Sequence, residues 1–296
     1  MANLPAGYPA ALEIVIPAHN EASRLPDGLA ALCAKAAALP LRAAILVVDS
    51  ASTDGTADLV RAWRGPVPVG LLRCHRAGKG VAVRAGLLAT RAPFVGFCDA
   101  DMSTDLSALD ETLTLLAAGR QVVIGSRALG ESDVEDRHSS TRRVGATVFR
   151  TLARLVVPEV SDTQCGFKFF DGPLARAAAA RLRTQGFAFD VELLASCRRL
   201  GALVTEIPVC WRDMPGSTFS VRRHSAAAFR DVAGIWVRHA SGYPRAQAPA
   251  RPVPVPLPVL APAPRMAVEV RRVAPEIQRV PAEGRRVGVS AGVITK

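Results

Sequence analysis

The 296-residue sequence predicts an α/β fold with a mostly parallel sheet flanked by helices. Short runs rich in β-branched residues alternate with longer Ala- and Leu-rich segments through residues 10–126. The short runs are apolar throughout, which is typical of strands that are buried on both faces of a sheet. Hydrophobic residues make up 49% of the chain and charged residues 21%, so a disordered or fibrous protein is excluded.

The first half of the chain contains five expected strands and four expected helices. Continuous apolar runs of strand length predict the strands, and longer Ala- and Leu-rich segments between them predict the helices. The expected strands are residues 12–16, 44–48, 68–72, 94–98 and 122–124. The expected helices are residues 21–38, 56–63, 81–90 and 106–118.

The second half is less regular. It contains expected helices at 143–156, 173–183, 189–200 and 221–239, a strand at 203–211 and a polar loop at 162–168. From residue 244 onward the chain holds 10 of its 22 prolines, a composition that predicts a flexible, polyproline-like tail. We therefore expect one domain over 1–243, with halves 10–126 and 127–243, followed by a basic, Pro-rich tail over 244–296.

The net charge of +11 is unevenly distributed. Residues 245–296 carry nine basic and three acidic residues, so more than half of the excess lies in the tail. The remaining charge is ordinary, and no basic face interleaved with aromatic residues is evident, so we expect no nucleic-acid partner. A leader and a membrane-spanning segment are not evident either. The six cysteines lack metal-ligand spacing and indicate a reducing compartment, so the expected location is cytoplasmic, at most peripheral on a membrane.

Polar residues gather directly after the expected strands. They occupy residues 17–21, 49–55, 99–101 and 125–127. Parallel strands of one sheet end at the same edge, and ligands bind beyond their carboxyl ends. This edge is therefore the predicted site.

Asp99 and Asp101 are the sharpest feature of this edge. Two carboxylates separated by one small residue can both reach one hard cation. Mg²⁺ or Mn²⁺ is typically held by one or two carboxylates and completes its shell with water and substrate phosphates. The alternative is a solvated turn or a helix cap, but the position among other polar strand ends favours the metal site.

Two further segments of this edge fit a nucleotide. Asp49 follows the second strand and can accept hydrogen bonds from a nucleobase or a ribose, whereas Asp54 before Gly55 is more typical of a helix start. Gly78, Lys79 and Gly80 open a helix and could hold phosphate through backbone N–H groups and the Lys charge. The segment is not a Walker A loop.

Basic and acidic residues of the second half complete the candidate site. Arginine suits a diphosphate because its guanidinium is planar and always charged, although any single one is also a common surface charge. The basic candidates are Arg127, Arg137, Arg142, Arg143 and Lys168, with Arg222 and Arg223 after a Gly-Ser turn. Asp190 and Glu192 lie near a helix start, where carboxylates also favour the helix dipole.

Seven runs resemble the family 2 glycosyltransferases of the GT-A fold, and most closely the polyprenyl-phosphate (dolichyl-phosphate) glucosyl- and mannosyltransferases. They are IVIPAHNE at 14–21, VVDSASTDGT at 47–56, GKG at 78–80, DAD at 99–101, GSR at 125–127, DTQCGFK at 162–168 and AFDVEL at 188–193. The last two resemble the dolichyl-phosphate glucosyltransferase branch. The resemblance covers residues 10–240 and implies a Rossmann-like, mostly parallel sheet with a C-terminal helical, acceptor-side region.

The resemblance also implies roles for individual residues. Pro17, Glu21, Asp49 and Lys79 would line the nucleotide site. Asp99 and Asp101, with Ser103, would hold Mg²⁺ or Mn²⁺ on the diphosphate. Arg127 and Arg143, or Arg137, would face the acceptor phosphate, Asp190 and Glu192 would border the sugar, and Arg222 or Arg223 would close over the phosphates. The run DSAS at 49–52 departs from the usual DDGS of the family.

The implied reaction is inverting, metal-dependent transfer of a hexose from a UDP- or GDP-sugar to a polyprenyl phosphate. The alternative is a soluble small-molecule or secondary-metabolite hydroxyl, which would need a base, with Asp190 as the candidate. The apolar and basic residues of 221–239 fit peripheral membrane contact. A sugar-nucleotide pyrophosphorylase lacks support, because its Gly-rich, Arg-containing opening loop is missing at residues 17–21.

Overall fold

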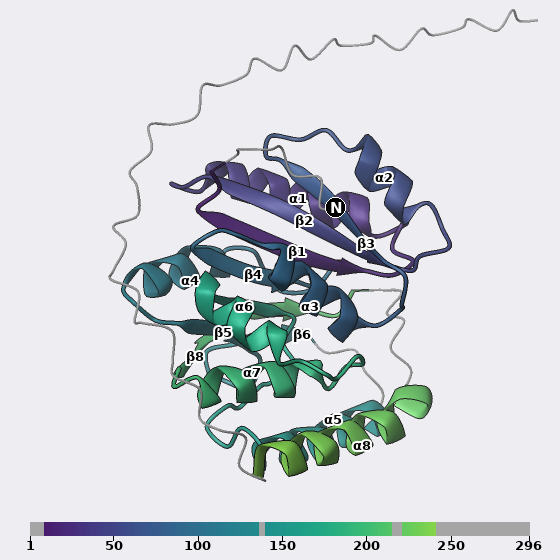
Figure 1. The fold of residues 1–296 in the computed structure, drawn as a ribbon, viewed down its shortest axis with the longest axis vertical. Helices are drawn as coiled ribbons and strands as arrows, with labels where there is room; N and C mark the ends of the chain where they lie inside the picture. Colours follow the sequence, from purple (N-terminus) through teal and green to yellow (C-terminus); the bar gives the residue numbers. More distant parts are fainter. Residues whose placement is uncertain (1–8, 136–139, 215–220, 241–296) are drawn as a thin grey trace, which may run out of the picture. The chain divides into compact units, whose positions relative to one another are not determined.

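The computed structural model describes residues 9–135, 140–214 and 221–240 (Figure 1). All of these residues belong to the first of the two units into which the chain divides, Met1–Ala261 and Pro262–Lys296. Strands drawn from both expected halves form one sheet, so the halves 10–126 and 127–243 are joined through it. The predicted tail at 244–296 lies outside the described residues and stays a prediction.

A seven-stranded sheet with the order β3-β2-β1-β4-β7-β5-β8 forms the centre of the fold (Figure 1). Its β1, β2, β4 and β5 strands are almost wholly buried, as their continuous apolar sequences predict. All neighbours pair in parallel except β7, which runs antiparallel to both β4 and β5. The strands are β1 Leu12–Ala18, β2 Ala43–Ser50, β3 Val69–Cys74, β4 Phe94–Cys98, β5 Val122–Ser126, β7 Phe167–Asp171 and β8 Val204–Pro208.

Eight helices and a small second sheet complete the described fold. The helices are α1 Leu25–Ala38, α2 Thr56–Ala62, α3 Lys79–Ala89, α4 Ala108–Ala117, α5 Ser140–Arg154, α6 Gly172–Ala180, α7 Phe189–Arg199 and α8 Val221–Ala240. The two strands β6 Asp133–Glu135 and β9 Cys210–Arg212 pair in parallel. Together these elements confirm the predicted α/β fold class.

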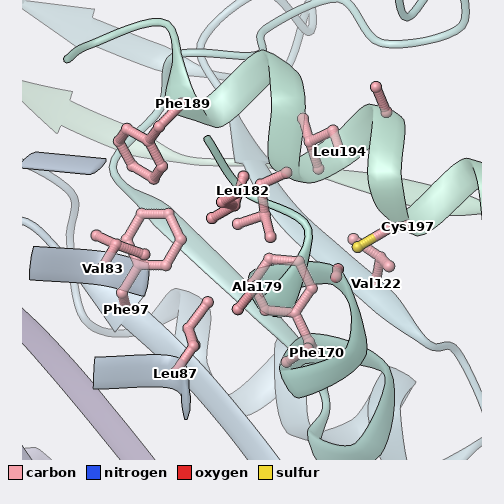
Figure 2. Close-up of a cluster of buried hydrophobic side chains, with 14 of the residues drawn as sticks. Val83, Leu87, Phe97, Val122, Phe170, Ala179, Leu182, Phe189, Leu194 and Cys197 are labelled. Atoms are coloured by element: carbon pink, nitrogen blue, oxygen red, sulfur yellow. The ribbon is translucent and has the colours of Figure 1, made fainter. Parts of the chain in front are cut away.

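Two hydrophobic cores cover the two faces of the sheet. Side chains alternate between faces along a strand, so Val15 of β1 joins one core while Ile14 and Ile16 join the other. The first core is built with α3, α6 and α7, and Figure 2 shows its aromatic part. There Phe97 lies 5.8 Å from Phe189 and 6.4 Å from Phe170, measured between ring centroids. The second core is built with α1, α2 and α4.

Three predicted elements of this fold are wrong at the level of detail. The loop expected at 162–168 overlaps the first two residues of the central strand β7, because Lys168 and the polar residues before Phe167 are typical of a loop. The helix expected at 21–38 begins only at Leu25, where Pro26 suits a first turn. The strand expected at 203–211 divides into β8 and β9, because Pro208 has no N–H with which to continue the ladder. Other expected boundaries lie within three residues of those observed.

The helices α5 and α8 lie side by side at one end of the first core (Figure 1). The rings of Phe149 and Phe229 pack between them at 6.5 Å, and Val232 and Ile235 of α8 are buried. Val148, Trp236 and Val237 remain exposed on the same two helices, and so does Leu155 directly after α5. The pair therefore packs on the body of the protein and also presents apolar side chains to solvent.

Within the described residues, no helix combines the length and the apolar character that crossing a membrane requires.

Candidate active site

The antiparallel strand β7 assembles the site at one edge of the sheet. Its first residue, Phe167, pairs with Cys98, the last residue of β4. An antiparallel strand begins where its neighbours end, so the segment 162–166 lies at the edge that follows β4 and β5. Asp99 donates its backbone N–H to the carbonyl of Gly166 at 3.0 Å, which joins two of the predicted motifs directly.

Asp99 and Asp101 occupy the loop that follows β4. Asp101 accepts two hydrogen bonds on Oδ1, from the backbone N–H of Ser103 at 3.1 Å and from its hydroxyl at 2.8 Å. Met102, which follows Asp101, has a φ of 48°, and its N–H donates to the carbonyl of Asp99 at 3.1 Å. These bonds hold a tight turn that places both carboxylates in one short loop.

Lys79 reaches the same carboxylates from the start of α3. Its Nζ lies 2.6 Å from Oδ1 of Asp99. Burial by itself lowers the pKa of Lys79, but the carboxylates of Asp99, Asp190 and Asp101 outweigh it and raise the pKa above its usual value. Lys79 therefore stays charged at the site.

The carboxylates of Asp99 and Asp101 fit a hard divalent cation whose remaining coordination positions are open to substrate. Among the described residues there is no cluster of three or more His, Cys, Asp or Glu side chains able to hold a metal ion. A closed protein cage is thus not formed from this part of the chain. Two partly exposed carboxylates suit Mg²⁺ or Mn²⁺, which complete their coordination with water and diphosphate oxygens.

Glu21 lies at this edge, but both of its carboxylate oxygens are engaged by Arg24. Nε of Arg24 donates to Oε2 at 2.9 Å, and Nη2 donates to Oε1 at 2.7 Å. The backbone N–H of Glu21 in turn donates to the hydroxyl of Thr56 at 2.9 Å. Burial is the largest influence on Glu21 and raises its pKa above the usual value, although Arg24 opposes the shift.

Asp49 and Pro17 lie beside each other across two paired strands. Asp49 is fully buried, and its Oδ1 accepts the N–H of Ser52 at 3.0 Å. Its Oδ2 accepts Nε of Arg73 at 3.2 Å, from the neighbouring position of β3. Pro17, in β1, pairs with Val48, which precedes Asp49.

Asp54 has the structural role that its sequence favours. Its Oδ1 accepts the N–H of Thr56 at 3.0 Å at the start of α2, and its Oδ2 accepts the N–H of Ala22 at 3.1 Å.

Gly78 and Gly80 allow another segment of the chain to pack closely against the start of α3. The backbone N–H of Gly80 is not available to a phosphate. That N–H donates to the carbonyl of Gln185 at 3.0 Å. Gly78 has a φ of 146°, and a Cβ at Gly80 would lie 2.5 Å from the carbonyl oxygen of Thr184. Close approach of the 184–185 segment thus requires these glycines, and the expected backbone cradle is wrong at Gly80.

Arg127 follows β5 and is locked to Asp162. Its Nε and Nη2 donate to the two carboxylate oxygens at 2.7 and 3.0 Å, and its backbone N–H donates at 3.0 Å. Asp162 is itself held by the carboxylate of Glu206, which accepts its N–H at 3.0 Å. The guanidinium also lies over Trp211, 5.3 Å from the ring centroid. Nη1 is the only guanidinium nitrogen of Arg127 that Asp162 does not engage.

We predict that Asp162→Asn lowers the free energy of unfolding at neutral pH. Burial alone would raise the pKa of Asp162, but Arg127 outweighs burial and lowers it to about 2. A shift of this size from the usual value corresponds to about 2 kcal/mol of stability. Because the pKa is lowered in the folded state, this stability is present above about pH 4 and is lost as the pH falls towards 2.

Urea unfolding of the wild type and the Asn variant at a series of pH values checks this prediction. The difference between the two proteins should be constant from pH 7 to 5 and shrink below pH 4. A difference that is independent of pH would show that the carboxylate charge of Asp162 is not what stabilises the segment.

Asp190 lies at the start of α7, where Lys168 of β7 meets it inside the protein. Nζ of Lys168 lies 2.8 Å from Oδ1 of Asp190, and both side chains are almost completely buried. Lys168 also donates to the carbonyl of Cys165 and lies over the Phe97 ring. Burial is the main influence on Asp190 and raises its pKa despite the two lysines. Lys168 is thus an interior partner of Asp190 and not part of a solvent-facing basic group.

Glu192 joins α7 to the chain before it and to α8. One carboxylate oxygen accepts the backbone N–H groups of Arg183 at 3.0 Å and Thr184 at 2.7 Å, and the other accepts Nη2 of Arg238 at 2.9 Å. Burial raises its pKa, but these donors outweigh burial and lower it. All of these bonds hold the protein together, so we propose that Glu192 positions α7 and the 183–185 segment.

The remaining predicted basic residues fall where side chains are not described. Arg142 and Arg143 lie in α5, and Arg222 and Arg223 lie in α8, with only their backbone described. Arg137 lies outside the described residues.

Two residues of the site were not anticipated from the sequence. Arg24 is three residues after Glu21, and this i,i+3 spacing of opposite charges is a sequence pattern that indicates an ion pair. Arg73 stands at the end of β3, in register with Asp49 of β2. That register depends on which strands pair, so no local pattern in the sequence indicates it.

Comparison with known proteins places this chain in a family. The model of the glycosyl transferase family 2 matches residues 13–172. The dolichyl-phosphate beta-glucosyltransferase of Drosophila melanogaster is 34% identical over 247 residues, which cover 78% of this chain and 76% of that protein. The Homo sapiens protein of the same name is 31% identical over 223 residues, covering 70% and 68% of the two chains.

Solved structures show the same fold at lower identity. The Mycobacterium tuberculosis glucosyl-3-phosphoglycerate synthase superposes with a TM-score of 0.57 at 21% identity, covering 78% of this chain and 81% of that one. A further structure of that protein contains Mn²⁺ and uridine diphosphate. The predicted GT-A-like, mostly parallel α/β fold is confirmed. By its sequence relatives and the matching family model, the chain belongs to glycosyltransferase family 2 and is a hexosyltransferase of that family.

Proposed function

We propose that the protein is an inverting, divalent-cation-dependent transferase that moves a hexose from a UDP- or GDP-sugar to a polyprenyl phosphate. The observation that carries the proposal is the Asp99–Asp101 turn, with Lys79 at 2.6 Å from Asp99 at the edge that follows β4. With a cation bound, this arrangement would combine the charge of the metal with that of Lys79, as departure of a nucleoside diphosphate requires.

The residues around the diphosphate have separate tasks in this proposal. Asp99 and Asp101 would hold Mg²⁺ or Mn²⁺, which supplies positive charge to the leaving diphosphate when bound. Ser103 holds Asp101 through two hydrogen bonds, so it orients this carboxylate whether or not it is also a ligand. The positive charge of Lys79 would act on the same diphosphate. In this proposal Pro17, Asp49 and Arg73 would contact the nucleoside.

A phosphate acceptor fits the basic residues of the second half. An anionic acceptor is already a nucleophile and needs no base, but it must approach an anionic donor. Arg127 offers Nη1 at the end of β5, and Arg143, Arg222 and Arg223 would add charge from α5 and α8. The sequence relatives are named for transfer to dolichyl phosphate, which supports the same acceptor class.

A transfer assay with alternative acceptors tests the proposal. The protein is incubated with Mn²⁺ and radiolabelled UDP-glucose or GDP-mannose, together with a polyprenyl phosphate in detergent or a panel of soluble hydroxyl compounds. We expect label on the lipid phosphate, with inversion at the anomeric carbon and loss of transfer in EDTA. Transfer to soluble hydroxyls alone would contradict the lipid acceptor, and no transfer from any donor would contradict the proposal.

The environment of Asp190 is the observation that favours the alternative function, transfer to a hydroxyl acceptor. Its Oδ1 is buried and, among the described residues, has Lys168 as its ion-pair partner at 2.8 Å. A buried carboxylate with a raised pKa is suited to accept a proton from a hydroxyl. The same assay distinguishes the two acceptors.

The exposed apolar side chains of α5 and α8 predict peripheral contact with an anionic membrane. Leu155, directly after α5, is 64% exposed, and Trp236 of α8 is 51% exposed. Arg150 and Arg154 of α5 are exposed as well. Leu155→Ser/Trp236→Ser should therefore reduce co-flotation with vesicles that contain phosphatidylglycerol. Leu203→Ser is the matched control, because Leu203 is 76% exposed before β8. Equal loss in both variants would contradict a role for this helix pair.

A further inference from the structure

The guanidinium of Arg24 is held in one orientation by two of its three nitrogens, which leaves the third for another contact. Two of its nitrogens, Nε and Nη2, bind the Glu21 carboxylate at 2.9 and 2.7 Å. This two-point contact fixes the plane of the guanidinium. The third nitrogen, Nη1, is buried and has no hydrogen-bond partner among the residues that the structure describes.

The free Nη1 of Arg24 faces the proposed metal site. It lies 4.0 Å from Oδ2 of Asp101, which is too long for a hydrogen bond but close for two opposite charges. A buried N–H without an acceptor is costly, and the cost is removed when a ligand supplies an oxygen. A phosphate oxygen beside Asp101 would meet this donor.

We propose that Arg24 is a donor-binding residue, oriented by Glu21, that contacts the diphosphate and makes cation binding depend on the nucleotide. This inference rests on the proposed function, because it assumes that a nucleoside diphosphate and a divalent cation share the site. It adds a direct protein contact to the diphosphate and gives Glu21 a positioning role.

The local charge explains why cation binding would depend on the nucleotide. Among the described side chains, three cations and four carboxylates meet in ion pairs around the site, so the net charge of this group is only −1. They are Arg24, Lys79 and Lys168 with Glu21, Asp99, Asp101 and Asp190. A free divalent cation gains little from so small a charge and is repelled by Arg24 and Lys79. A diphosphate brings the missing negative charge and is attracted by the same two residues.

Removal of Arg24 should thus have opposite effects on the two ligands. The Arg24→Met variant has a local charge of −2 with Glu21 ionised, so free Mn²⁺ should bind more tightly, by about tenfold, at a pH high enough to keep Glu21 ionised. UDP or GDP without metal should bind more weakly, also by about tenfold, because a charged hydrogen bond to phosphate is lost. Arg24→Lys keeps the charge and should retain the Mn²⁺ affinity of the wild type, with an intermediate loss of nucleotide affinity.

The double variant Glu21→Gln/Arg24→Met separates charge from contact. It restores the local charge to −1, so its affinity for free Mn²⁺ should return to that of the wild type. It still lacks the guanidinium, so its nucleotide affinity should stay low. If Arg24 served only to neutralise Glu21, the double variant would instead recover nucleotide binding.

Equilibrium binding measures both effects without transfer activity. Electron paramagnetic resonance reports free Mn²⁺, and calorimetry with UDP and with GDP reports nucleotide binding, while thermal unfolding checks that each variant is folded. Unchanged nucleotide affinity in folded Arg24→Met, or recovery in the double variant, would overturn the inference. Failure of the wild type to bind either nucleotide would instead overturn the proposed function. Arg24→Lys and the double variant keep the test open if Arg24→Met is unfolded.

Discussion

Gly166→Ala is expected to reduce transfer by at least about a hundredfold, although no atom of Gly166 takes part in the proposed reaction. A Cβ at this position would lie 1.9 Å from Oδ2 and 2.1 Å from Cγ of Asp99. The backbone has little freedom to move apart, because the Asp99 N–H donates to the Gly166 carbonyl and Cys98 pairs with Phe167. The Asp99 side chain must therefore turn away from Lys79 and from the cation site.

Kinetics with the donor and the polyprenyl phosphate measure this effect, and Gly130→Ala provides the matched control. A Cβ at Gly130 would meet no atom within 4 Å, so this variant should keep the kcat/KM of the wild type. Weaker Mn²⁺ binding in the presence of nucleotide should accompany the loss in Gly166→Ala. Full activity in this variant would mean that the observed orientation of Asp99 is not needed.

Asp101→Ala is expected to abolish transfer, with a loss of at least about a thousandfold in kcat/KM, while the protein stays folded. Asp101 is partly exposed, and its hydrogen bonds are confined to Ser103, so little of the core depends on it. The proposed cation would lose one of its two carboxylate ligands. Positive charge at the leaving diphosphate would fall with it.

Ser103→Ala is the matched control for Asp101→Ala. It removes the hydroxyl bond to Asp101 and keeps the carboxylate, so a loss of about tenfold or less is expected if Ser103 only orients Asp101. Activity is measured against Mn²⁺ concentration, and circular dichroism checks the fold. Transfer by Asp101→Ala that does not require metal would refute the metal site at residues 99 and 101.

The acceptor side depends on interactions that connect distant segments. Glu206 of β8 holds Asp162, and Asp162 holds Arg127, so one orientation of the guanidinium depends on three segments of the chain. The predicted role of Arg127 in facing an acceptor phosphate stays a prediction. The structure adds that this arginine has one guanidinium nitrogen left for such a contact once Asp162 is bound.

Local pattern in the sequence is sufficient for most of the fold and for the place of the proposed metal site after β4. Continuous apolar runs identified β1, β2, β4 and β5, because a strand buried on both faces requires them. Asp99 and Asp101 were recognised because they follow such a strand directly. The family was recognised in the same way, since its motifs are short and contiguous.

The tertiary structure decided which residues face one another. β7 contains Lys168 between phenylalanines and follows a polar run, so its sequence resembles a loop, and only its pairing with β4 and β5 shows a central strand. That insertion brings Gly166 against Asp99 and Lys168 against Asp190. The partners of Glu21, Arg127 and Glu192 were likewise decided by folding. A strand or a turn is determined over a few neighbouring residues, whereas an ion pair between distant segments exists only once strand order and register are set.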